Sequence, residues 1–137
     1  MYKRQGRFLD AFYADLATSP DPACTAKTLD QTVILTVHGD QPHTPYNRSA
    51  WPDNTPGSTN WVYVMGNGYL KPGWFGDGKP DDSLDSIHPT SGAIDNTLTT
   101  LDTAHAASAA IAYAVAKGDM VRVREFYTGP DIDAFVV

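Results

Sequence analysis

Hydrophobic residues recur at helical spacing near the start of the chain. Phe8, Phe12 and Leu16 follow one another at intervals of four residues, which predicts an apolar stripe on a helix over residues 5–18. Ser19-Pro20 marks the expected end of this helix, because proline cannot continue it and disfavours helical geometry in the residue before.

Two short apolar runs further along predict strands. Residues 32–37 and 61–65 are rich in β-branched and aromatic side chains and are bounded by turn residues, so we expect buried strands over 31–38 and 61–66. The polar connection over 39–60 has no periodic pattern. A segment of this length inside a compact domain is usually functional or covers another part of the protein.

An alanine-rich segment predicts a long helix over residues 97–117. Asp95 or Asn96 can cap its start, and Gly118 can supply a left-handed stop. We expect its apolar side to carry Leu98, Leu101, His105, Ala109 and Ala112.

The remaining segments complete the expected fold. Residues 19–30 and 77–91 are predicted as loops, Asp119 can cap a short helix reaching about residue 127, and residues 132–137 form a hydrophobic tail. Strands flanked by helices, without regular hairpin spacing, favour an α/β fold with a mainly parallel sheet.

Length and charge narrow the classes of protein to consider. At 137 residues the chain is one domain at most, and 16 acidic against 10 basic residues argue against a nucleic-acid-binding face. No apolar run is long enough to span a bilayer, and the single Cys24 excludes an internal disulfide. Residues 1–5 look like translated sequencing adapter from assembled environmental reads, which would leave 6–137 as the protein segment; the alternative is a genuine basic N-terminus.

His38 is the sharpest candidate for chemistry. It ends the first predicted strand, two residues before Asp40, where an imidazole and a carboxylate could bind a metal or share a proton. The alternative is a histidine satisfied by the backbone at a strand end. His43 could join the pair or be a solvated loop histidine, and Asp102 with His105 is interpreted as a surface pair on the long helix.

Four aspartates in the 77–91 loop superficially suggest a calcium loop: Asp77, Asp81, Asp82 and Asp85. Their spacing does not match the EF-hand pattern, which needs glycine at its sixth position and glutamate at its twelfth. The alternative is a solvated acidic loop.

An ordered set of short matches resembles the C-terminal part of the alkaline phosphatase superfamily, within its sulfatase-like, uncharacterised branch of exported bacterial proteins. The matching text is residues 30–39, Thr44-Pro45, Asn60-Trp61, 65–68 and 73–77. The resemblance implies a partial alkaline-phosphatase-like fold, with residues 6–137 as a C-terminal fragment and a periplasmic or secreted location.

The resemblance also implies a metal site for zinc or calcium. His38 matches a family ligand, whereas Val37 falls on an acidic ligand and Asn60 on a later histidine, so the metal site is degenerate unless Asp40 replaces the missing acid. The family's nucleophile would lie upstream of the fragment. The implied chemistry is metal-assisted cleavage of phosphate or sulfate esters.

Two functions follow. The first is a metal-dependent ester hydrolase with His38 and Asp40 as ligands, in which His43, Arg48 and Asn60 contact the substrate. The second is a non-catalytic exported binding or surface protein on the same fold. A small-molecule ester or a glycan-like ligand is the expected partner.

Overall fold

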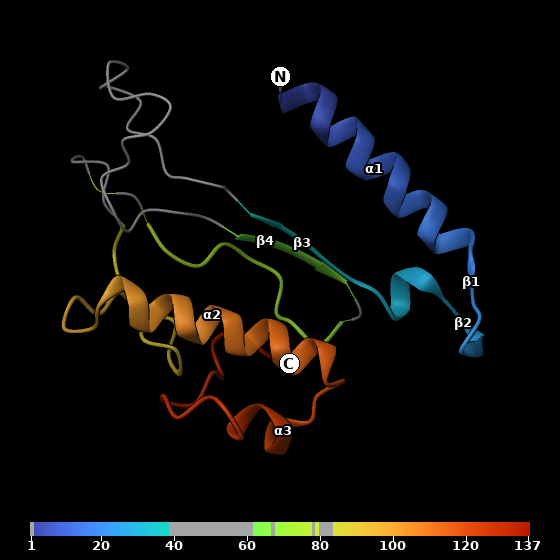
Figure 1. Cartoon of the computed structure of the whole chain (residues 1–137). Coiled ribbons are helices and arrows are strands. Elements are labelled where there is room, and N and C mark those ends of the chain that lie inside the picture. Colours follow the sequence, from blue (N-terminus) through green and yellow to red (C-terminus); the bar gives the residue numbers. More distant parts are fainter. Residues whose placement is uncertain (1, 39–61, 67, 78, 80–83) are drawn as a thin grey trace.

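The computed structural model describes residues 2–38, 62–66, 68–77, 79 and 84–137. In chain order the elements are α1 (Tyr2–Thr18), β1 (Pro20–Asp21), β2 (Cys24–Thr28), the 3₁₀ turn η1 (Leu29–Gln31), β3 (Ile34–His38), β4 (Val62–Gly66), α2 (Thr100–Val115) and α3 (Met120–Arg124). Figure 1 shows β3 and β4 on one side of α2 and α3 on the other, with α1 standing apart from α2.

The predicted N-terminal helix is confirmed as α1. Its C-terminal end is closed by hydroxyl groups, since Ser19 Oγ donates to the Asp15 carbonyl at 2.8 Å. Leu16 is buried, but Phe8 is 74% and Phe12 40% exposed. Among the described residues, the apolar stripe of α1 is therefore well covered only near η1 and β2.

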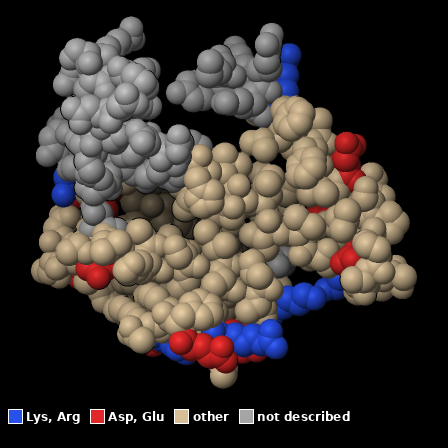
Figure 2. Space-filling view, in the orientation of Figure 1, with Lys and Arg blue, Asp and Glu red and all other residues tan. Residues whose placement is uncertain are grey.

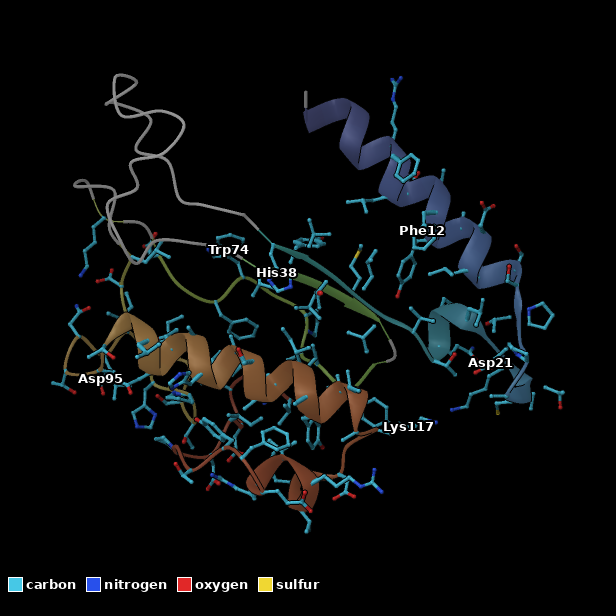
Figure 3. All side chains as sticks on the ribbon, in the orientation of Figure 1. Phe12, Asp21, His38, Trp74, Asp95 and Lys117 are labelled. Atoms are coloured by element: carbon cyan, nitrogen blue, oxygen red, sulfur yellow. The ribbon has the colours of Figure 1, made fainter. Side chains whose placement is uncertain are left out.

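The prediction of a plain loop over residues 19–30 is wrong, because β1 and β2 form a small antiparallel hairpin there. The buried Asp21 organises it by accepting a hydrogen bond from the Ala23 amide at 2.7 Å. This bond and one from Thr32 hold the pKa of the Asp21 carboxyl below its usual value, with a smaller contribution from the charge of Lys117 (Figure 3). Hydrogen bonds between side chain and backbone create this turn, and hydrophobic periodicity does not report them.

Strands exist at both predicted positions, but their residues are half-buried or exposed rather than buried. The predicted mainly parallel, alkaline-phosphatase-like sheet is wrong. β3 and β4 pair antiparallel, with Ile34 opposite Gly66 and His38 opposite Val62, and the described strands form sheets of two strands each. Gly66 is required where β4 ends, since a Cβ there would lie 2.3 Å from the Val33 carbonyl oxygen. Strand patterning gives position but not direction, because a long connection can return a strand either way.

The long helix begins at neither Asp95 nor Asn96. The Thr99 hydroxyl accepts from the Asp102 amide, and the Asp102 carboxylate accepts from the Thr99 amide at 2.8 Å, which completes a capping box. Asp95 instead accepts from the Thr97 amide at 3.0 Å and turns the chain ahead of the helix. The predicted left-handed stop at Gly118 is confirmed, with φ +85°.

The core lies between α2, α3 and the C-terminal tail. Its buried members are Ala106, Ala109, Ala110, Val123, Tyr127, Ile132, Phe135 and Val136. The predicted apolar side of the helix is right for Ala109 and Ala112 but wrong for Leu101 and His105, which are exposed, and the buried positions on α2 are alanines. Small side chains let α3 and the tail approach the backbone of α2 closely, which larger ones at the same positions would prevent.

The second half of the 77–91 segment is tied to this core. Ser86, Ile87 and Pro89 are buried, which corrects the prediction of a surface loop there. The Ile87 amide donates to Thr103 Oγ1 of α2 at 3.1 Å. The Ala134 amide donates to the Pro89 carbonyl at 2.9 Å, so this segment is fixed between α2 and the tail.

Replacing Ala106 by leucine should destabilise the fold. Ala106 is fully buried, and extra methylene groups in a packed core cost about 1–3 kcal/mol. The free energy of unfolding, measured by urea titration, should fall by this amount. Ala104→Leu adds the same side chain at an exposed position of α2 and should change stability by less than about 0.5 kcal/mol. Equal effects from both variants would contradict this packing.

Candidate functional site

His38 is the one predicted site residue that the structure describes. It is exposed at the end of β3, and its Nε2 lies 3.1 Å from Thr36 Oγ1 on the same strand. The other candidates, Asp40, His43, Arg48 and Asn60, lie outside the described residues. The described parts of the chain contain no group of three His, Cys, Asp or Glu side chains placed to hold a metal ion.

The suggested calcium loop is described only in part. Asp81 and Asp82 lie outside the described residues, and Asp85 forms an ion pair with Lys79, whose Nζ is 3.1 Å away. The Asp85 amide donates to the Asp77 carbonyl at 3.0 Å. The carboxylate of Asp85 is thus paired with a protein cation in the described part of this segment.

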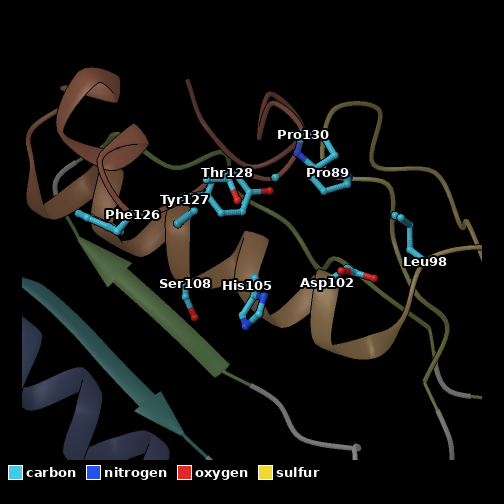
Figure 4. A pocket seen from close by; sticks show the side chains of 11 residues that line it. Pro89, Leu98, Asp102, His105, Ser108, Phe126, Tyr127, Thr128 and Pro130 are labelled. Atoms are coloured by element: carbon cyan, nitrogen blue, oxygen red, sulfur yellow. The ribbon is translucent and has the colours of Figure 1, made fainter.

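A pocket of about 450 Å³ lies between α2 and the segment that follows α3. Asp102, His105 and Ser108 line one wall, residues 126–130 line the other, and Pro89 closes one end (Figure 4). His38 is not among the residues that line the pocket and lies at the end of β3 (Figure 3).

The wall formed by α2 carries three polar side chains, Asp102, His105 and Ser108. Their spacing of three residues places them along one side of the helix. Two hydrogen bonds from Thr99, with a smaller contribution from His105, hold the pKa of the Asp102 carboxyl below its usual value. The Ser108 hydroxyl donates to the Ala104 carbonyl at 2.9 Å, so its oxygen remains available as an acceptor.

Arg124 fixes the opposite wall. Its guanidinium donates to the Gly129 carbonyl at 2.5 Å, pairs with the Asp131 carboxylate, and lies 5.4 Å from the centre of the Tyr127 ring. Gly129 is needed beneath that ring, since a Cβ there would come within 2.5 Å of the Tyr127 hydroxyl oxygen. The wall is therefore shaped by one cation and one glycine.

Two aromatic side chains, Phe126 and Tyr127, line the pocket. Phe126 is 68% exposed, whereas Tyr127 is only 8% exposed. Burial raises the pKa of the Tyr127 phenol; Arg124 lowers it, and Asp102 and Asp131 raise it further. Tyr127 therefore stays a neutral hydroxyl group at physiological pH.

The polar wall that α2 contributes to the pocket has a signal in the sequence, namely polar residues spaced three apart. The Asp102–His105 pair was interpreted as a surface pair, although the same spacing continues to Ser108. The three polar side chains would have indicated a polar stripe. Residues 126–130 carry no comparable signal, because tertiary packing alone brings them opposite α2.

No family model, curated protein or solved structure matches this chain. The resemblance to the alkaline phosphatase superfamily therefore stays a prediction, and the sheet it implied is wrong for the described strands. None of the helices in the described ranges has both the length and the apolar character needed to cross a bilayer. Figure 2 shows acidic and basic side chains side by side along the lower edge of the molecule. At the start of α3, the Arg122 guanidinium lies 3.5 Å from the Asp119 carboxylate.

Replacing Arg124 by alanine should loosen the pocket wall. The change removes the contacts to Gly129, Asp131 and Tyr127, and we expect a loss of about 1–3 kcal/mol in unfolding free energy. Arg122→Ala is the matched control, because its side chain is 75% exposed and pairs with Asp119; it should cost less than about 1 kcal/mol. Chemical denaturation of both variants measures the difference, and equal losses would contradict the role of Arg124.

Asp102→Asn should lower the thermal midpoint at neutral pH. The lowered pKa means that the ionised carboxylate stabilises the fold above the unfolded value of 3.8 and loses this effect as the pH falls through the folded pKa. The gap between wild type and variant should therefore narrow as the pH falls below 3.8 and close once the pH lies below the folded pKa. Asp10→Asn changes an exposed carboxylate in α1 and should show little gap at neutral pH. A gap for Asp102→Asn that persists at low pH would contradict this cap.

Proposed function

We propose that this chain is a non-catalytic binding protein that takes a small polar ligand in the pocket between α2 and residues 126–130. The pocket itself is the observation that carries the proposal. Its volume of about 450 Å³ lies within the range of about 300–1,000 Å³ common for small-molecule sites. Aromatic walls with a few convergent polar groups are typical of such sites.

The hydrogen bonds around the pocket support binding over catalysis. A serine nucleophile needs a base that takes its proton, yet the Ser108 hydroxyl donates to the Ala104 carbonyl. The Asp102 carboxylate accepts hydrogen bonds from both the amide and the hydroxyl of Thr99 at one oxygen, Oδ2, so the cap holds the side chain in place and no described residue uses it as a base. Among the described residues, the groups are thus arranged to contact a ligand rather than to activate a nucleophile.

The ester hydrolase stays a prediction of the resemblance. Of the two metal ligands predicted for the hydrolase, the structure describes His38, which is exposed and lies next to Thr36 Oγ1. No described contact favours hydrolysis over binding. A small-molecule ester and a glycan-like ligand both fit the size of the pocket. The proposal includes the periplasmic or secreted location that the resemblance implies.

Titration followed by amide NMR tests the proposal. The probes are glucose, galactose and mannose as neutral sugars, and glucose 6-phosphate and 4-nitrophenyl sulfate as esters. We expect saturable shifts confined to residues that line the pocket, because a ligand bound there changes their surroundings. Ser108→Phe should abolish the shifts by filling the pocket, whereas Val115→Phe, at a 63% exposed position of the same helix, should leave them intact.

The outcomes that would overturn the proposal are specific. Shifts from none of the five probes, or shifts that persist in Ser108→Phe, would refute binding in this pocket. Steady release of nitrophenol from 4-nitrophenyl sulfate with added zinc or calcium, lost in His38→Ala, would favour the hydrolase instead.

A further inference from the structure

We infer that the pocket selects a neutral, polyhydroxylated ligand such as a sugar ring, and that the Tyr127 hydroxyl is the group that recognises it. This inference rests on the proposed function, because it names the ligand class of the same pocket. The buried hydroxyl, the charges that face the pocket and the exposed aromatic at its rim each support it.

Tyr127 is more than nine-tenths buried and lines the pocket, yet within the described part of the chain its hydroxyl has no hydrogen-bond partner. Figure 4 shows its ring among the side chains of the pocket. A buried hydroxyl without a partner costs free energy, which a hydrogen bond to a ligand would offset. The Arg124 and Gly129 contacts hold the ring in place, so the hydroxyl is fixed before a ligand arrives.

The charges facing the pocket favour a neutral ligand. Asp102 lines it as a carboxylate, and none of the described lining residues is lysine or arginine. Arg124, which contacts the Tyr127 ring, is already paired with Asp131 and the Gly129 carbonyl. Anionic esters are normally bound by arginine, lysine or helix N-termini, whereas a carboxylate accepts hydrogen bonds from ligand hydroxyls and repels a phosphate.

The rim of the pocket supplies the apolar half of sugar recognition. Phe126 is 68% exposed, and Leu98 and Pro89 also line the pocket. A sugar ring has one face of C–H groups and an edge of hydroxyls. The ring face can pack on Phe126 while the hydroxyls reach Tyr127, Asp102 and His105, a combination typical of polar-ligand pockets.

The test compares Tyr127→Phe with wild type, using glucose, galactose and mannose as neutral probes and glucose 6-phosphate as the anionic probe. Wild type should bind at least one neutral sugar about tenfold or more tightly than glucose 6-phosphate. Tyr127→Phe should weaken that affinity about tenfold. Its melting temperature should stay equal or rise, because the variant removes a hydroxyl that has no partner.

Two controls separate recognition from folding. Tyr113→Phe removes a tyrosine hydroxyl outside the pocket and should leave affinity unchanged. Asp102→Asn should reduce the preference for the neutral sugar over glucose 6-phosphate. Thr99→Ala weakens the same helix cap but keeps the carboxylate, so it should retain the preference.

Each contrary result has one meaning. If wild type binds none of the neutral and anionic probes, the proposed function fails and this inference fails with it. If wild type binds neutral sugars but Tyr127→Phe binds them equally well, or melts clearly earlier, the inference fails while the binding function stands. Tighter binding of glucose 6-phosphate than of any neutral sugar would refute the ligand class alone.

Discussion

The alanine face of α2 is the constraint on which the described structure depends. Ala106, Ala109, Ala110 and Ala114 are buried, and the small side chains let α3 and the C-terminal tail pack close to the helix backbone. Much of the hydrophobic area that stabilises this contact comes from its partners, including Val123 and Ile132. The same packing brings residues 126–130 across from the polar stripe of α2 and so forms the pocket.

Polar contacts then fix the pocket walls that packing has brought together. Arg124 holds the loop after α3 through Gly129 and Asp131, and Thr99 holds Asp102 through the capping box. Asp102 therefore has two roles, since the hydrogen bonds that keep it ionised for the helix cap also keep a negative charge at the pocket. Under the proposed function, local stability and ligand preference would both depend on this one carboxylate.

The proposed site is the pocket between α2 and residues 126–130, and not the end of β3 at His38. In open α/β folds, ligands bind at the edge where parallel strands end. The strand that ends at His38 instead has an antiparallel partner, so the described strands do not form such an edge. The pocket on α2 uses none of the residues that the resemblance indicated. The pocket has the aromatic ring of Phe126 at its rim, the buried phenol of Tyr127 and the carboxylate of Asp102, which are suited to recognising a ligand. Asp102 comes from a segment distant in the sequence from Phe126 and Tyr127.

Helix and strand positions and helix ends could be predicted from the order of neighbouring residues alone. This order gave the position of α1, the positions of β3 and β4, the Asp119 cap of α3 and the Gly118 stop, because periodicity and capping are local. For the polar wall, the prediction was limited to a surface pair of Asp102 and His105. The antiparallel pairing, the buried side of α2 and the contact of Tyr127 with the side of α2 that carries Asp102, His105 and Ser108 became visible only in the folded chain. Each of these depends on contacts between distant segments, whose relative placement no local pattern specifies.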